Sequence, residues 1–247
     1  MRIIGRCNFR CPACSTFSSP EREGILRIDH FRQIVQTLAR EDFQGVVNLS
    51  GGEPTLHPKL ATMIRYVSET LPRARIIVFT NGSWIGQPWW RRKLESLMAG
   101  PNVLIRFSLD RQHAEGALKA SARSGQDGLR EIERVRFEQA RAFQDACVSL
   151  GAEPGVRFDF AFKGTMDEAR AYMASLGTPP VYLITFQKKP AQRTKKFGYF
   201  AIDIDSRGRA SVYPTLGHIP RGEAIGGIEE LPTALRMNRS FLKLAGE

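Results

Sequence analysis

Short apolar runs alternate with longer amphipathic segments from residue 2 to residue 186. The short runs favour β-strands, because they are rich in β-branched and aromatic residues and are bounded by turn-forming residues. Strands are predicted at residues 2–5, 46–50, 75–80, 103–109, 156–162 and 181–186. Helices are predicted between them, at residues 29–39, 58–70, 88–98, 127–150 and 167–176. This repeated order of strand and helix is typical of a parallel sheet with helical crossovers.

The pattern changes after residue 186, where a basic segment containing Pro190 begins. Two short β-rich runs follow at residues 199–204 and 209–213, with a turn predicted at residues 205–208. A last helix is predicted at residues 231–244. We therefore expect a parallel α/β core in residues 1–190 and a smaller appendage, a β-hairpin plus a helix, in residues 191–247.

The composition fits one globular α/β domain with a large core, since 42% of the 247 residues are hydrophobic. Four cysteines, three of them clustered, do not form the even disulfide framework of small secreted domains. The sequence shows neither the apolar core of a signal peptide nor an apolar run long enough to cross a bilayer. We expect a cytoplasmic protein that does not enter a membrane.

The formal net charge of +11 favours anionic partners, such as nucleic acid, an acidic peptide or a phosphorylated small molecule. The basic residues are scattered, however, and no basic motif interleaved with aromatic residues is present. A solvated cationic surface is the simpler interpretation of the same charge.

The most informative motif is a triad of cysteines, Cys7, Cys11 and Cys14, separated by three residues and then by two. A 4Fe-4S cluster is normally held by four thiolates, so three ligands leave one iron open to another donor. A structural zinc site is the alternative, but zinc needs a fourth ligand and the nearest histidine is His30.

A second motif, Ser50-Gly51-Gly52-Glu53-Pro54, follows the second predicted strand. Paired glycines allow a ligand to approach the backbone closely, and Glu53 supplies a hydrogen-bond acceptor beside them. On its own, the same motif is an ordinary turn. The cysteine triad changes this interpretation, because both motifs then point to the same ligand.

Two further motifs lie at predicted strand ends. Thr80-Asn81-Gly82-Ser83 ends the third strand, and Ser108-Leu109-Asp110 ends the fourth. Ser108 and Asp110 are two residues apart, so on a strand they share a face and could bind sugar hydroxyls together. A turn at Asn81-Gly82 and a helix N-cap at Asp110 are the structural alternatives, and both are compatible with a functional role.

These four motifs, in this order on a β/α scaffold, closely resemble those of the radical S-adenosylmethionine (radical SAM) superfamily. The resemblance implies a partial (β/α)6 barrel over about residues 2–186. It also implies one 4Fe-4S cluster on Cys7, Cys11 and Cys14, whose open iron chelates S-adenosylmethionine. Residues expected to bind the cofactor are Phe9, Ser50, Gly51, Gly52, Glu53, Pro54, Thr80, Asn81, Ser108 and Asp110.

The implied reaction begins with reductive cleavage of S-adenosylmethionine to a 5′-deoxyadenosyl radical, which abstracts hydrogen from a substrate. An external electron donor such as flavodoxin or ferredoxin is the implied reductant. The expected substrate is a peptide, as in the maturation of ribosomally made peptides, or a natural-product or sugar precursor. His113 is a candidate catalytic residue because it follows the fourth strand closely, although loop histidines are often merely exposed.

The appendage resembles the SPASM or twitch extension of radical SAM enzymes, in which a cysteine helps to hold an auxiliary cluster. Thr215 follows Tyr213-Pro214 here, and no cysteine occurs after Cys147, so no auxiliary cluster is expected. Two alternatives stay open. One is an iron-sulfur or zinc protein that regulates by binding nucleic acid, and the other is a radical SAM enzyme that modifies RNA.

Overall fold

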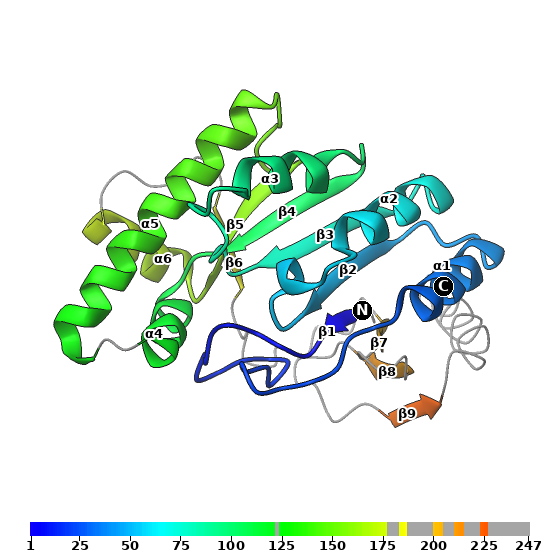
Figure 1. The fold of residues 1–247 in the computed structure, drawn as a ribbon, viewed down its shortest axis with the longest axis horizontal. Coiled ribbons are helices and arrows are strands. Elements are labelled where there is room, and N and C mark those ends of the chain that lie inside the picture. The colour runs from blue at the N-terminus through cyan, green and yellow to red at the C-terminus, as the bar shows by residue number, and fades with distance from the viewer. Residues whose placement is uncertain (122–123, 177–182, 187–199, 205–209, 215–222, 227–247) are drawn as a thin grey trace.

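The computed structural model describes residues 1–121, 124–176, 183–186, 200–204, 210–214 and 223–226 (Figure 1). Six of the described strands form one sheet in the order β1-β2-β3-β4-β5-β6, and every neighbouring pair is parallel. The strands are β1 (Arg2–Ile4), β2 (Val46–Gly51), β3 (Arg75–Thr80), β4 (Val103–Ser108), β5 (Phe158–Lys163) and β6 (Leu183–Phe186). Because the order in the sheet never reverses, each crossover advances the sheet by one strand, as in a barrel. The predicted α/β fold with a partial barrel is confirmed.

Helices connect the strands and follow one another along the sheet (Figure 1). Neighbours in the chain contact one another, α1 with α2, α2 with α3, α4 with α5, and α5 with α6. Their bounds are α1 (Ile28–Arg40), the short 3-10 helix η1 (Pro54–Leu56), α2 (Leu60–Thr70), α3 (Trp90–Met98), α4 (Arg111–Ala120), α5 (Gly125–Ser149) and α6 (Met166–Leu176). The sequence pattern predicts all of these except η1 and α4. None of the described helices combines the length and apolar character needed to cross a bilayer.

The core lies between the helices and one face of the sheet. Alternate residues of a strand point to opposite faces, and Ile105 and Phe107 of β4 are fully buried in the hydrophobic cluster. Four phenylalanines of β4, β5 and α5 pack with ring centroids 5.8 to 6.3 Å apart. The residues of β4 that alternate with Ile105 and Phe107, namely Arg106 and Ser108, belong to the opposite, inner face. This face is therefore more polar than the core face, and it is where a ligand can be held.

The C-terminal strands β7 (Phe200–Ile204), β8 (Ala210–Pro214) and β9 (Glu223–Gly226) form a separate antiparallel sheet. The predicted hairpin corresponds to β7 and β8, whereas β9 is a third strand that the sequence pattern does not predict. The turn predicted at residues 205–208 and the helix predicted at residues 231–244 lie outside the described residues.

Candidate active site

The carboxyl ends of the parallel strands surround a cavity of about 460 Å³. Loops that gather at this end of a parallel sheet build the site in α/β proteins. All but one of the predicted site residues line this cavity, namely Cys7, Phe9, Cys11, Cys14, Ser50, Gly51, Gly52, Glu53, Thr80, Asn81, Ser108, Asp110 and His113. The exception is Pro54, which is buried at the first position of η1.

The cysteine loop leaves β1 and carries three free thiols. Cys7 Sγ accepts hydrogen bonds from the backbone N–H of Phe9 at 3.4 Å and from Asn81 Nδ2 at 3.7 Å. Cys14 Sγ accepts one from the backbone N–H of Ser18 at 3.3 Å. N–H groups aimed at sulfur stabilise a thiolate, so these sulfurs are already arranged for metal ligation.

The thiols differ in acidity. Burial raises the pKa of Cys7 to about 11, and burial together with the charges of the neighbouring thiolates raises the pKa of Cys11 to about 12. Burial also opposes ionisation of Cys14, but hydrogen bonds from Thr16 and the Ser18 backbone outweigh it and lower the pKa. Thiolates at Cys7, which is buried, and at Cys11, which is partly buried, need a nearby cation, and a coordinated metal deprotonates its thiols outright.

Gly116 of α4 holds the cysteine loop in place, a role that the sequence pattern does not indicate. Its carbonyl accepts a hydrogen bond from the Arg10 backbone N–H at 3.0 Å. A Cβ at this position would lie 2.5 Å from Cys11 Sγ and 2.7 Å from the Cys11 backbone nitrogen. The loop therefore packs directly on the helix backbone, which only glycine permits at this distance.

The two glycines after β2 serve the packing of the chain on itself. A Cβ on Gly51 would lie 2.2 Å from the Ile4 carbonyl oxygen, and a Cβ on Gly52 would lie 1.9 Å from that of Arg6. Backbone hydrogen bonds run from Gly52 N to Ile4 O at 2.7 Å and from Glu53 N to Arg6 O at 3.0 Å. The glycines thus fix the Glu53 loop against the start of the cysteine loop, in addition to lining the cavity.

Glu53 is 1% exposed, and its carboxylate is the centre of a hydrogen-bond network. Oε1 accepts from the backbone N–H of Thr55 at 3.1 Å and from the hydroxyls of Thr55 and Thr80 at 2.6 and 2.8 Å. Oε2 accepts from the backbone N–H of Asn81 at 2.7 Å. Since Oε1 already has three donors, Oε2 is the oxygen with capacity for a further donor, such as a ligand ammonium.

Asp110 and His113 form a pair at the entrance to α4. Asp110 Oδ1 caps the helix by accepting from the His113 backbone N–H at 2.9 Å, and it lies 2.8 Å from His113 Nδ1. Burial opposes ionisation of Asp110, but hydrogen bonds from His113 and the charge of Arg136 outweigh it and lower the pKa. An ionised carboxylate only accepts hydrogen bonds, so Nδ1 is the ring nitrogen that donates to Asp110, which leaves Nε2 of His113 for another partner. The N-cap alternative for Asp110 is confirmed.

Two cations near the cavity are not indicated by the sequence pattern. Lys163 ends β5, lines the cavity and donates from Nζ to the Ala13 carbonyl at 3.0 Å. Arg136 of α5 is 2% exposed and donates to the carbonyls of Asn81 and Ser108, so it joins the ends of β3 and β4.

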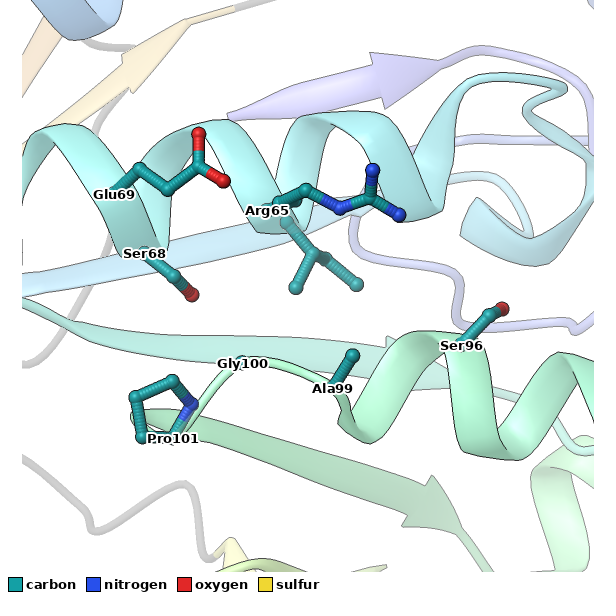
Figure 2. A pocket seen from close by; sticks show the side chains of 8 residues that line it. Arg65, Ser68, Glu69, Ser96, Ala99, Gly100 and Pro101 are labelled. Carbon is teal, nitrogen blue, oxygen red and sulfur yellow. The ribbon is translucent and has the colours of Figure 1, made fainter.

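A second hollow of about 300 Å³ lies away from the strand ends, between α2 and the segment from α3 to β4. Figure 2 shows Arg65 and Glu69 of α2 on one side of it and Ser96, Ala99 and Pro101 on the other. No cysteine or histidine lines it.

Among the described residues, no group of three or more His, Cys, Asp or Glu converges on a single metal ion. A cubane presents a separate iron to each thiolate, so its ligands do not have to meet at one point.

The family model for the radical SAM superfamily matches residues 1–135, and the chain belongs to this superfamily. The enzymes of this superfamily use a 4Fe-4S cluster and S-adenosylmethionine.

Curated relatives match only a part of this chain. A GTP 3′,8-cyclase of Synechococcus elongatus is 30% identical over 107 residues, which are 42% of this chain and 31% of the relative. An S-adenosylmethionine-dependent nucleotide dehydratase of Selenomonas ruminantium is 26% identical over 88 residues, 36% of this chain and 31% of the relative. The matched region thus spans about a third of the length of these relatives.

Solved structures share the fold. The structure of native anSMEcpe with bound AdoMet and the Cp18Cys peptide superimposes with a TM-score of 0.55 at 17% identity, covering 99% of this chain and 81% of that one. At this identity the likeness concerns the fold alone.

The residues present fit the family's cofactors. The three thiols line one cavity, and those of Cys7 and Cys14 receive N–H donors, while Glu53 Oε2 has capacity for an ammonium on the same cavity. Soft thiolates suit an iron-sulfur cluster, and an ionised carboxylate suits the amino group of a methionine moiety.

Proposed function

We propose that Cys7, Cys11 and Cys14 hold one 4Fe-4S cluster and that the remaining residues of the cavity bind S-adenosylmethionine. Glu53 would accept a hydrogen bond from the methionine ammonium at Oε2. Ser108 and Asp110 would contact the ribose, and Asp110 would do so through Oδ2. Phe9, Ser50, Thr80 and Asn81 would line the cofactor, whereas Pro54 would act indirectly by starting η1. The single observation that carries the proposal is that three thiols and the Glu53 carboxylate line one cavity.

When bound and reduced, the cluster would supply one electron to S-adenosylmethionine, and the carbon–sulfur bond would break to give methionine and a 5′-deoxyadenosyl radical that would take a hydrogen atom from the substrate. The electron comes from an external donor such as flavodoxin or ferredoxin. The chain's own residues bind and orient the reactants and exclude water from them. His113 would contact the substrate through Nε2, where it can accept a proton.

The substrate we propose is a peptide or a natural-product precursor such as a sugar. Support comes from the inner face of the barrel, where Arg106 of β4 donates to Asp159 of β5 at 2.8 and 2.6 Å. Asp159 is 2% exposed, and the Arg106 guanidinium stacks 5.3 Å from the ring centroid of Phe79, which lines the cavity. Neither Arg106 nor Asp159 lines the cavity itself, but the polar residues Ser108, Gln112 and Lys163 do, and a polar lining suits a substrate with several hydrogen-bonding groups.

Anaerobic reconstitution with iron and sulfide, followed by dithionite and S-adenosylmethionine, tests this function. We expect cluster absorbance and formation of 5′-deoxyadenosine by the wild-type protein. The triple variant Cys7→Ala/Cys11→Ala/Cys14→Ala should lose both signals. The matched control Cys147→Ala removes the buried cysteine of α5 and should keep both. A fully loaded wild-type protein that forms no 5′-deoxyadenosine would reject the proposal.

A nucleotide is a second candidate substrate. Its support is that the two curated relatives are named as a GTP cyclase and a nucleotide dehydratase, together with the net charge of +11. Nucleoside triphosphates, presented to the loaded enzyme, would then raise 5′-deoxyadenosine formation more than short peptides do. Binding to RNA or DNA with steep salt dependence and no cofactor cleavage would instead favour the nucleic-acid-binding alternative.

We further propose that residues 1–190 form the catalytic core and residues 191–247 an extension without an auxiliary cluster. The separate sheets support this division, since the six-stranded sheet ends at β6 and the three-stranded sheet begins at β7. A reducing compartment such as the cytoplasm suits a chain whose described cysteines are all free.

A further inference from the structure

Arg136 stands out among the groups around the cavity because it is a fully desolvated cation. It comes from α5, is 2% exposed, and donates from Nη1 to the Asn81 carbonyl at 2.7 Å and from Nη2 to the Ser108 carbonyl. Its third nitrogen, Nε, has no hydrogen-bond partner among the described residues. A lysine cannot make the same planar two-point contact, so the geometry at this position is specific for arginine.

The guanidinium lies beside the cysteine loop. Its central carbon is 5.2 Å from the ring centroid of Phe9, between Cys7 and Cys11, and 5.6 Å from that of Phe107. It interacts electrostatically with Asp110, Cys11 and Glu53. Arg136 is thus a buried positive charge that interacts with three acidic groups of the cavity.

Arg136 is also linked to Cys7 indirectly, through hydrogen bonds of Asn81. While Arg136 holds the Asn81 carbonyl, Asn81 Nδ2 donates to Cys7 Sγ at 3.7 Å and to Asn8 Oδ1 at 3.0 Å. One buried cation therefore fixes a donor to the Cys7 sulfur and lies close to Cys11.

A cluster gains one negative charge when it is reduced. A fixed positive charge nearby in a medium of low dielectric stabilises that charge, and hydrogen bonds to the sulfurs act in the same direction. We propose that Arg136 is a positioning residue which sets the reduction potential of the cluster, making it easier to reduce. The proposal rests on the proposed function, since it assumes a cluster on Cys7, Cys11 and Cys14.

The test is a redox titration of the reconstituted full chain without S-adenosylmethionine, followed by electron paramagnetic resonance of the reduced cluster. At the potential where half of the wild-type cluster is reduced, the ratio of reduced to oxidised cluster should fall about tenfold in Arg136→Gln, equivalent to about 59 mV for one electron. Arg136→Lys keeps the charge but loses the two-point contact, and its ratio should stay within about threefold of wild type.

Arg157 offers a matched control. It likewise donates to two backbone carbonyls, those of Pro101 and Met98 at 2.8 and 2.6 Å, and its Nε likewise has no partner among the described residues. It lies just before β5, at the opposite end of the strand from Lys163. Arg157→Gln should therefore affect stability but leave the reduced fraction as in wild type.

Arg136→Gln leaves Asp110 without the positive charge beside it, which could prevent folding. A second pair of variants tests the inference in that case. Asp110→Asn removes only the negative charge, and the double variant Asp110→Asn/Arg136→Gln removes both charges, so the two variants differ only in the charge of Arg136. The ratio of reduced to oxidised cluster at a fixed potential should fall about tenfold from the single to the double variant.

The outcomes are distinct. Equal reduced fractions in wild type and Arg136→Gln, or in the two Asp110 variants, overturn the inference while the proposed function stands. A reduced fraction in Arg136→Lys as low as in Arg136→Gln also overturns it, since a purely structural role then explains both. A wild-type chain that takes up no cluster refutes the proposed function itself.

Discussion

The carboxylate of Glu53 shows how one residue can be both structural and available to a ligand. Oε1 accepts three hydrogen bonds that tie η1 and β3 together, whereas Oε2 accepts only the Asn81 backbone N–H. Because the side chain is almost fully buried, its charge is poorly screened, and an ammonium at Oε2 would interact with it strongly.

Replacing Glu53 by Gln should weaken S-adenosylmethionine binding by roughly 10-fold to 100-fold, because a hydrogen bond to a charged partner is worth about 1.5–3 kcal/mol. Equilibrium dialysis of the cofactor against the cluster-loaded chain measures the effect, with iron content as a check on loading. Glu69→Gln, an exposed change on α2, serves as the control. An unchanged affinity in the Glu53 variant would refute the assigned contact.

Residues in local motifs could be predicted from sequence, and those in long-range contacts could not. The cysteine spacing is local, and Gly51-Gly52-Glu53 follows its strand directly, so both are readable from the chain. Arg136 lies 55 residues from Asn81, and nothing in the charged, amphipathic segment of α5 distinguishes it from its neighbouring arginines. Its role depends on packing between α5 and the strand ends, which no local pattern encodes.

At the scale of elements, α4 places His113 at the cavity and Gly116 against the cysteine loop, yet the sequence pattern does not predict this helix. Glycine in the middle of a helix costs about 0.5–1 kcal/mol relative to alanine, which weakens the helical signal of residues 111–120. Tertiary contact overrides that local preference, since the Cys11 loop lies against the helix where a side chain would collide.

Gly116→Ala should therefore separate the helix preference of residue 116 from its contact with the cysteine loop. Alanine favours the helix, but its Cβ would lie within 3 Å of backbone as well as side-chain atoms of Cys11, so the loop must shift. We expect a folded chain that retains less iron after reconstitution than wild type. Iron analysis with far-UV circular dichroism measures both properties. Lys119→Ala, an exposed change on the same helix, should keep full iron content, and equal iron in both variants would contradict the expectation.

At the scale of the whole molecule, the strand pattern fixes which face of the sheet is core and which is site. On β4 and β5 the buried phenylalanines alternate with Arg106, Ser108, Asp159 and Lys163, so one face packs on helices and the other holds polar groups. The parallel direction of the strands was predictable from the repeated order of strand and helix, whereas the partial barrel was implied by the resemblance to the family. The appendage was only partly predictable, because the short segment of β9 lacks a strong strand pattern.

The pH dependence of the unfolding free energy should contain a contribution from Cys147, which is fully buried beside Met98. Burial raises the pKa of this thiol to about 12, from a model-peptide value of 9.0. Above pH 9 the unfolded chain loses this proton while the native chain keeps it, so the native state binds more protons and stability falls as pH rises. The contribution is complete below pH 9 and is lost progressively toward pH 12.

Urea unfolding of the metal-free chain at pH 8 and pH 10, compared with Cys147→Ala, isolates this contribution. Between the two values wild type should lose about 1 kcal/mol more unfolding free energy than the variant, because one pKa unit corresponds to about 1.4 kcal/mol. The other thiols, tyrosines and lysines titrate in both proteins, so their effects cancel in the difference. Val148→Ala, an exposed neighbour on α5, should show the same pH dependence as wild type. If Cys147→Ala did so too, the thiol would not be buried in the manner described.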